Sequence, residues 1–564
     1  MVFRLKHSRQ QLLIGVLLLT VLFGFPYLSR DFLGLEHDTM FHLSRIEGLA
    51  ESISRGDFFP AIYPYKNNGF GYASPLFYCD LLLIPSALLY LAHVPLSVCY
   101  TLLVLTVTFC SAWAMASLCF RITGKLPASL LSAAAFTFSN YRITDVYVRG
   151  ALGEITAMIF LILLLNSVYE LFEAQRPDGW KTLWLAVSGL ICSHNLTALM
   201  GFFVFGLYWI RYAGRCSGAI HRSCVKALIL SFLCTAWFTI PMLEQLHSQE
   251  FYLHYYAASS DLADSALPLW KYFANRTVFG YASNQLPKNL QMNLNPGFFL
   301  MISPLFWLFL SGSDRRNAFV NMTLLLGICT CLLPSQLLPW DRMEFLRILQ
   351  FPWRFLTLAV VFLSVSASWI VARLTEKQSG IVLLLLTAVL AEGFWHVMPA
   401  RNRTFGITSS TSYEDLLSGR LIDPYYSASY VRVELAGGEY LPAASPDFRT
   451  WNASFRDESG NELDLPYSRD GVRLVFSITD LPEDHTVVCP LTWYKGYRAY
   501  DDTGEVNVSA SAQSLVTVKC DHSGSYTVLY EKTPVRKICG WISLFTCLCI
   551  LFAEIRHYFP RFPR

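Results

Sequence analysis

The sequence predicts a polytopic α-helical membrane protein of about 12 transmembrane helices that carries a small all-β domain. The 564 residues are 54% hydrophobic and only 15% charged, and the mean hydropathy is +0.38. A soluble protein could not cover that much apolar surface. Residues 398–535 change character, because short alternating segments separated by turn residues replace the long apolar runs. That pattern predicts β strands.

The basic residues predict the orientation of the helices. Arg4, Lys6 and Arg9 precede the first apolar run, and arginines also follow the last one. The positive-inside rule therefore puts both termini in the cytoplasm. No small-x-small cleavage site precedes Asp31, so we expect an uncleaved first helix. The net charge of +3 is too small to indicate a nucleic-acid partner.

The sequence has about 13 apolar segments. An odd number of crossings would put the two termini on opposite sides of the membrane, so we expect one segment, 76–93, not to cross. It contains Asp80 and Pro85 and lies between two further prolines, which suits a re-entrant or surface-lying arm. The predicted domains are then a transmembrane domain over 1–397, the β domain over 398–535, and a final helix and cytoplasmic tail over 536–564. The predicted outer stretches are 29–75, 140–151, the surroundings of His194, 244–296, 335–354 and the β domain.

The first outer loop gathers ionisable residues close to the membrane. Glu36, His37, Asp38 and His42 fall within seven residues. An amphipathic helix with Phe41, Ile46, Leu49 and Ile53 on one side is expected to follow at the membrane surface. This arrangement can hold a reactive carboxylate at the lipid–water boundary.

Later outer segments add further candidate site residues. Asp145, Arg149 and Glu154 head a long apolar helix, where they either serve function or anchor the interface. His194 is either a hydrogen-bonded structural residue or part of the site. Arg354 opens an apolar span after Phe-Pro-Trp, where it either binds phosphate through its forked guanidinium or anchors the helix by snorkelling. Residues 341–350 are expected to form another surface helix.

The predicted β domain leaves two questions open. Trp493, Tyr494, Tyr497 and Tyr500 either stack on sugars or fill the core. Cys489 and Cys520 either pair on an oxidising side or stay free. The chain has no P-loop, GxGxxG, GxSxG or HExxH motif and no paired CxxC, so we expect no cofactor.

Several stretches, in their order and spacing, resemble the bacterial YfhO-like membrane proteins. The same resemblance extends to the group labelled as 6-pyruvoyl-tetrahydropterin synthase-related, and through both to the GT-C glycosyltransferases. The resemblance implies a GT-C-like transmembrane domain that takes a sugar from a polyprenyl-phosphate carrier on the outer face. The chain has no DxD motif, which argues against a required divalent metal, and a divalent metal stays only as the alternative to the expected absence of a cofactor. The matching stretches are EHDTMFHLSRIEG, GYASPLFY, DVYVRGALGE, SHN, QFPWRF and TWYKGYRAYDDTGEV.

The resemblance also implies roles for individual residues. Asp38 occupies the place of the catalytic base, and Asp145 or Glu154 matches a second acidic site. Arg354 with Arg149 would offset the charge on the departing phosphate. His37 or His42 would orient Asp38. The expected partners are the lipid bilayer, a polyprenyl-phosphate-linked sugar, and an acceptor that is a cell-envelope polymer or protein. A lipid-linked-sugar flippase and a non-catalytic envelope-assembly scaffold remain as alternatives.

Overall fold

We describe the protein from a computed structural model, which covers residues 2–259, 261–375, 378–412, 415, 438–448, 450–479 and 485–558. The chain forms two compact units. Unit 1 comprises Met1–Met40, Pro95–Leu228 and Ala257–Ser412, and unit 2 comprises Phe41–Val94, Ile229–Tyr256 and Tyr413–Arg564. The two units are defined by which residues contact one another. The domain ranges predicted above come from sequence composition, and they stay predictions.

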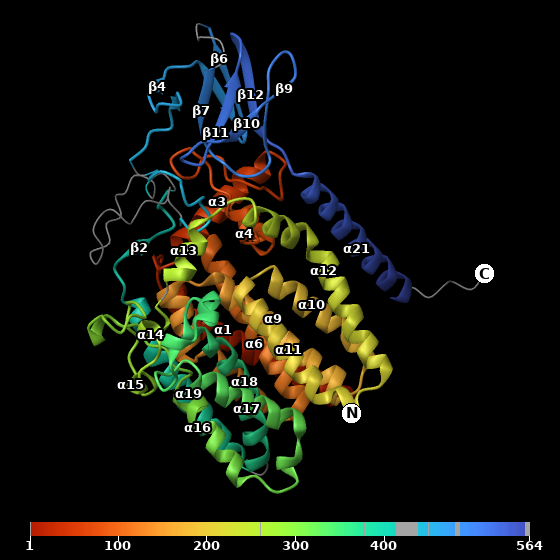
Figure 1. The fold of residues 1–564 in the computed structure, drawn as a ribbon. Coiled ribbons are helices and arrows are strands. Elements are labelled where there is room, and N and C mark those ends of the chain that lie inside the picture. Colours follow the sequence, from red (N-terminus) through yellow and green to blue (C-terminus); the bar gives the residue numbers. More distant parts are fainter. Residues whose placement is uncertain are drawn as a thin grey trace, which may run out of the picture. The chain divides into compact units, whose positions relative to one another are not determined.

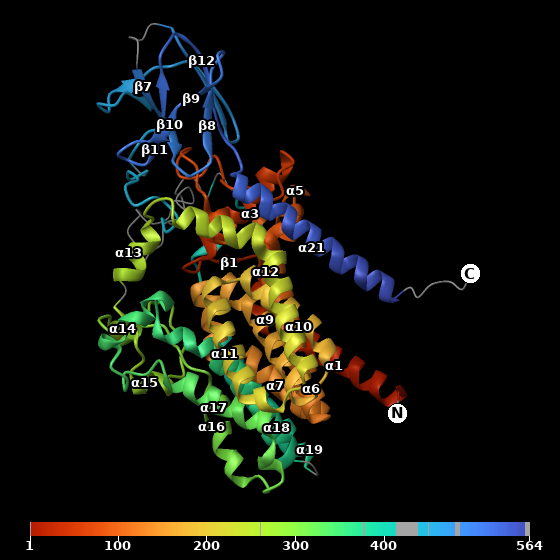
Figure 2. The ribbon, with the colours of Figure 1, turned by 45° about the vertical axis from the view of Figure 1, so that its right-hand side comes forward.

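Unit 1 is a bundle of helices built around α18 (Phe355–Leu374), whose side chains are almost all buried. Its small residues, such as Ala359 and Ser364, let neighbouring helices approach closely, and α6, α7, α9 and α17 pack against it. Figures 1 and 2 show these long helices side by side. The elements lying wholly in unit 1 include α1 (Val2–Phe23), α2 (Phe25–Leu28), α6 (Leu96–Thr123), α7 (Leu126–Thr137), α8 (Asn140–Thr144), α9 (Leu152–Val168), α10 (Trp180–Ile191), α11 (Asn195–Tyr212), α14 (Leu262–Ser265), α15 (Leu269–Tyr272), α16 (Phe298–Ile302), α17 (Ala318–Leu332) and α19 (Ser379–Arg401), and a two-stranded sheet of β1 (Leu33–Gly34) and β2 (Gly406–Ile407).

Seven helices in the described part of the chain are long and apolar enough to cross a membrane. Five more apolar helices have 10–17 residues. The total of twelve crossings and the cytoplasmic position of both termini stay predictions. The seven long segments are Leu96–Thr123, Leu152–Glu173, Asn195–Arg215, Gly218–Leu246, Pro352–Leu374, Gly380–Arg401 and Pro534–Arg556.

Segment 76–93 is divided into short pieces: α4 (Ser74–Phe77), a 3₁₀ turn and α5 (Ile84–Leu91). Eight helical residues rise only about 12 Å, whereas the hydrocarbon core is about 30 Å thick. Helix α5, which lies within the shorter apolar segment Leu81–Leu91, is too short to cross by itself, and it stays a prediction that segment 76–93 does not cross the membrane.

The surface helix expected over 341–350 was a wrong prediction. The structure has two 3₁₀ turns there, Trp340–Arg342 and Glu344–Leu349. Gln350 adopts a left-handed conformation with φ of 64°, and Pro352 follows two residues later. Neither is compatible with a continuous α-helix, so the chain bends before α18 begins.

Unit 2 takes in more than the predicted β domain. Helix α3 (Thr39–Ser54) lies almost entirely in it and buries Ile46, Leu49 and Ile53, so the predicted helix is confirmed, whereas its position at the membrane surface stays a prediction. Helix α12 (Gly218–Leu246) enters unit 2 at Ile229, and α13 (Tyr252–Ser259) begins in it. Its remaining elements include α21 (Pro534–Tyr558) and the strands β3 (Phe455–Arg456), β4 (Glu462–Leu463), β5 (Tyr467–Asp470), β6 (Arg473–Ile478), β7 (His485–Thr492), β8 (Tyr497–Tyr500), β9 (Glu505–Val506), β10 (Val508–Ala510), β11 (Leu515–Cys520) and β12 (Gly524–Tyr530).

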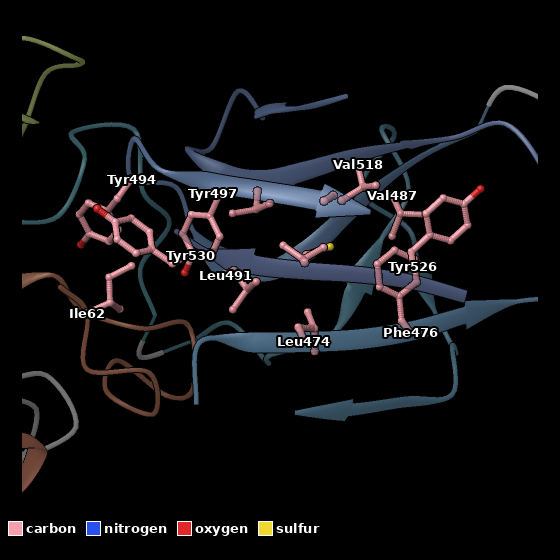
Figure 3. Close-up of a cluster of buried hydrophobic side chains, with 14 of the residues drawn as sticks. Ile62, Leu474, Phe476, Val487, Leu491, Tyr494, Tyr497, Val518, Tyr526 and Tyr530 are labelled. Carbon is pink, nitrogen blue, oxygen red and sulfur yellow. The ribbon is translucent and has the colours of Figure 1, made fainter. Parts of the chain in front are cut away.

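The predicted β domain is confirmed as two five-stranded antiparallel sheets. Their strand orders are β10-β11-β7-β3-β4 and β5-β6-β12-β8-β9. One apolar core joins inward side chains of both sheets, among them Val487, Phe476 and Tyr526 (Figure 3). Ile62, which precedes the strands by nearly 400 residues, belongs to the same core. Residues 55–77 are therefore part of this fold.

The structure answers the question of the cysteine pair and half of the question of the aromatic residues, because Trp493 and Tyr500 are only partly buried and their contact with sugars stays a prediction. Tyr494 and Tyr497 are core residues with 0% and 4% exposure, so they do not offer a face to a sugar. Cys489 and Cys520 are free thiols. Cys520 lies opposite His485, four residues from Cys489, which places their Cα atoms about 13 Å apart. A disulfide requires less than about 7 Å.

Candidate active site

The loop Glu36–Thr39 lies on the segment that joins α8 to α9. This segment is a π-helical turn, Asp145–Arg149, followed by Gly150. The backbone N–H of Asp38 donates to the carbonyl of Arg149 at 2.8 Å, and that of His37 donates to Val148 at 3.3 Å. The first two predicted outer loops therefore meet, and the meeting point holds Asp38.

Gly150 makes this close approach possible. Its φ is +63°, and a Cβ there would lie 2.6 Å from Thr39 Oγ1 and 3.1 Å from Thr39 N. Gly124 has a similar φ of +67° but open space around it. We expect Gly124→Ala to lower the free energy of unfolding by about 1–2 kcal/mol, the cost of a left-handed alanine. Gly150→Ala should cost clearly more, because the loop must also move. Thermal unfolding of the purified variants measures both, and equal losses would contradict the contact.

Arg149 is held between two carboxylates. It forms ion pairs with Asp145 and with Glu154, the latter at 3.0 Å. Its guanidinium carbon lies 4.3 Å from the centre of the Trp353 ring. The side-chain exposures of 8% for Arg149, 0% for Asp145 and 2% for Glu154 show that water does not screen this arrangement.

Glu154 has further partners from two other elements. Its second oxygen accepts a hydrogen bond from the Tyr141 hydroxyl at 2.5 Å and another from the Thr357 hydroxyl of α18. A buried carboxylate with several donors is fixed in position. Burial and the charge of Glu154 raise the pKa of Asp145 well above its usual range. The contacts give both carboxylates the role of positioning Arg149, and direct catalysis by either stays a prediction.

Arg354 lies at the start of α18 and is 7% exposed. One terminal nitrogen lies 3.2 Å from His194 Nε2, and the other donates to Gln350 Oε1 at 2.7 Å. The Nε atom of Arg354 and the indole Nε1 of Trp353 are buried donors without an acceptor among the described residues. The guanidinium N–H is a donor of the kind that binds an anionic oxygen.

His194 holds Arg354 as a neutral ring. Burial and the Arg354 cation lower the pKa of His194 to about 3. Its Nε2 lies 3.2 Å from a terminal nitrogen of Arg354, and its Nδ1 lies 2.8 Å from Thr197 Oγ1 and accepts the backbone N–H of Thr197 at 3.4 Å. Through these contacts, His194 is a hydrogen-bonded structural residue that also lies in the candidate site, so the two interpretations do not exclude each other.

Asp38 differs from the other acidic residues near the site because its carboxylate is open. It is half-buried, and no hydrogen bond or ion pair to its carboxylate is found among the residues the structure describes. Partial burial raises the pKa of Asp38, and the charges of Arg149 and Arg354 oppose that shift. The structure therefore brings Asp38, Arg149, Arg354, Glu154 and His194 into one electrostatic site.

The two histidines predicted to orient Asp38, His37 and His42, belong to different units of the structure. The His37 ring stacks on Tyr281 with centroids 4.5 Å apart, beside the site in unit 1. His42 belongs to unit 2, where its Nδ1 lies 3.1 Å from a terminal nitrogen of Arg45. Orientation of Asp38 by either histidine stays a prediction.

Several contacts of the site could not be predicted from the sequence. Tyr141, Thr357 and Gln350 are ordinary polar residues of apolar segments, although Thr357 follows Arg354 by one helical turn. Glu36 accepts a hydrogen bond from Thr39 at 2.6 Å and faces Arg403 at 3.7 Å. Burial raises the pKa of Glu36 to about 7. No local sequence pattern predicts the contact of Glu36 with Arg403, which lies far away in the chain.

A group able to hold a metal ion lies elsewhere. Asp501, Asp502 and His522 of unit 2 place ligand atoms within 4.8 Å of one another. In the part of the chain that the structure describes, no such group includes Asp38 or Glu154.

Comparison with known proteins gives distant likenesses. No family model matches the chain. A curated protein of Lactococcus lactis subsp. cremoris (strain MG1363), described as an uncharacterized protein, is 25% identical over 255 residues, or 43% of this chain and 41% of that protein. The cryo-EM structure of the arabinofuranosyltransferase AftD from Mycobacteria aligns with 13% identity and a TM-score of 0.44, covering 72% of this chain and 28% of that chain. Likenesses at this level establish neither a family nor an activity, so membership of the YfhO-like and GT-C families stays a prediction.

Proposed function

We propose that this protein is a membrane glycosyltransferase that moves a sugar from a polyprenyl-phosphate carrier to a cell-envelope acceptor on the outer face. The observation that carries the proposal is the open carboxylate of Asp38, on which the charges of the two buried arginines Arg149 and Arg354 act. A base next to an anion-binding site is the combination that transfer from a sugar phosphate requires.

The residues divide the chemistry between them. The acceptor hydroxyl oxygen attacks the anomeric carbon, and Asp38 takes the proton that leaves the hydroxyl. The bond from the anomeric carbon to the phosphate oxygen breaks, and its electron pair leaves on the phosphate. Arg354, with its unpaired Nε–H, and Arg149 stabilise that charge in a site from which water is largely excluded. Attack opposite the leaving group inverts the anomeric centre, as in inverting glycosidases.

The phosphate role of Arg354 predicts a specific loss of activity. Arg354→Lys keeps the charge but loses the planar fork and the Nε–H. We expect sugar transfer to fall about 10²-fold, the usual cost of losing one preorganised donor. The assay uses protein reconstituted in liposomes with lipid-linked sugars extracted from cells that lack the protein, and it measures released polyprenyl phosphate. Arg342→Lys is the control, because the Arg342 side chain is 83% exposed. A wild-type rate for Arg354→Lys would refute the role, and no release by the wild type would refute the proposed function.

A further inference from the structure

The outer face of one sheet in unit 2 carries Ser509, Thr517 and Arg456, together with the buried Val488, which belongs to a second apolar cluster with Leu515. Ser509 pairs with Thr517, Thr517 with Val488, and Val488 with Arg456, across strands β10, β11, β7 and β3. Directly paired residues share one face of a sheet. These paired residues therefore lie on one face, whereas the alternate residues, including Val487, Val516, Val518 and Phe455, fill the core.

This face is hollowed into a groove. Its volume is about 420 Å³, within the usual range of ligand pockets. The loops 457–460 and 510–513 form two of its walls, and Trp451 lines it as well. Asp457 holds the first loop by accepting hydrogen bonds from the backbone and side-chain nitrogens of Asn461 at 2.9 and 2.8 Å.

The lining offers hydrogen bonds and one aromatic surface. The side-chain amides of Asn507 and Gln513 are exposed, and neither has a hydrogen-bond partner among the described residues. Trp451 is half-buried, and the Arg456 guanidinium lies 4.6 Å from its ring centre. Amides present donors and an acceptor at once, which matches neighbouring sugar hydroxyls. An indole ring supplies rigid apolar area beside them.

We propose that this groove binds a carbohydrate chain. A peptide that joins a sheet adds to its edge, where backbone groups are unpaired, but this groove lies over the face of four paired strands. The open amides of Asn507 and Gln513 are suited to hydroxyl groups instead. If the proposed function holds, the ligand is the acceptor polymer, and only that identification rests on the proposed function.

The experiment measures retention of glycan by the full-length protein. Purified protein in detergent is immobilised and incubated with polysaccharide released from the envelope of the cells that make the protein, and in parallel with a peptide digest of the same envelopes. The variants are Trp451→Ala and Gln513→Ala. The matched controls are Trp541→Ala, at a tryptophan that is 72% exposed in α21, and Gln285→Ala, at an exposed glutamine of unit 1.

We expect the wild type and both controls to retain polysaccharide, with at least a tenfold loss of affinity in Trp451→Ala and a smaller loss in Gln513→Ala. Gln513 is exposed, so its variant decides the result if Trp451→Ala fails to fold. Retention of peptide alone, no retention of polysaccharide, or unchanged retention in folded groove variants would overturn the proposal. Asp38→Asn should bind polysaccharide normally, which separates failure of the groove from failure of the transferase.

Discussion

Replacement of Asp38 by asparagine is expected to slow sugar transfer about 10²–10⁴-fold, the range for loss of a positioned general base. Asparagine has nearly the same size as aspartate and keeps one carbonyl oxygen. It replaces the other carboxylate oxygen with a neutral NH₂ group, which cannot act as a base. The carboxylate has no ion pair or hydrogen bond among the described residues, and the anchoring contact of Asp38 is made by its backbone N–H. The melting temperature should therefore stay close to that of the wild type.

The control for this variant is Asp341→Asn, because the Asp341 side chain is 69% exposed. It should transfer sugar at the wild-type rate. A large fall in melting temperature with Asp38→Asn would mean that Asp38 serves the fold, and an unchanged rate would mean that another group takes the proton.

The rate of transfer should also depend on pH through Asp38. Only the deprotonated carboxylate accepts a proton, so the rate falls as pH drops through the pKa of Asp38. Partial burial raises that pKa above the usual value, so the acid limb of the wild-type profile should lie above pH ~4, the ordinary range of aspartate. The residual activity of Asp38→Asn should lack this limb.

Replacement of Arg149 by methionine is expected to cost about 3–5 kcal/mol of folding free energy, because it removes one partner from a buried ion pair. Asp145 and Glu154 would both lose their cation, and burial leaves no water to replace it. Reduced yield in the membrane and a much lower melting temperature should accompany the loss of activity.

The chain offers a matched control for Arg149→Met. Arg55 and Glu51 form an ion pair with the same four-residue spacing as Asp145 and Arg149, but their side chains are 38% and 25% exposed. Exposed pairs contribute about 0–1 kcal/mol, so Arg55→Met should change stability little. Similar losses in the two variants would contradict the buried, unscreened character of the Arg149 pairs.

Much of the candidate site could be predicted from sequence because charge in an apolar context is conspicuous. Arg149, Glu154 and Arg354 each stand at the head of an apolar segment, where an unpaired charge is costly. That cost predicts that each charged side chain has a partner, and the structure shows such partners. The sequence does not predict which residues pair. In the structure Arg354 contacts His194, and Arg149 forms ion pairs with both Asp145 and Glu154.

Other features could not be predicted because they depend on long-range contacts. The apolar face of α3 reads the same whether lipid or protein covers it, so the packing of residues 41–94 into unit 2 was not apparent. The groove is built from strand register, which a single sequence does not specify for distant strands. The chain bends at Gln350 through a left-handed backbone conformation that glutamine seldom adopts.

We propose that the protein transfers sugar from a lipid carrier, with Asp38 as the base and Arg354 stabilising the departing phosphate. The most direct measurement compares cells lacking the protein, complemented with wild type or with Asp38→Asn. Lipid mass spectrometry measures polyprenyl-phosphate-linked sugar, and sugar analysis measures the envelope polymers. We expect Asp38→Asn to insert normally, accumulate the lipid-linked sugar and leave one polymer without its sugar. Wild-type lipids and polymers with Asp38→Asn, in cells where the deletion alters both, would contradict the claim.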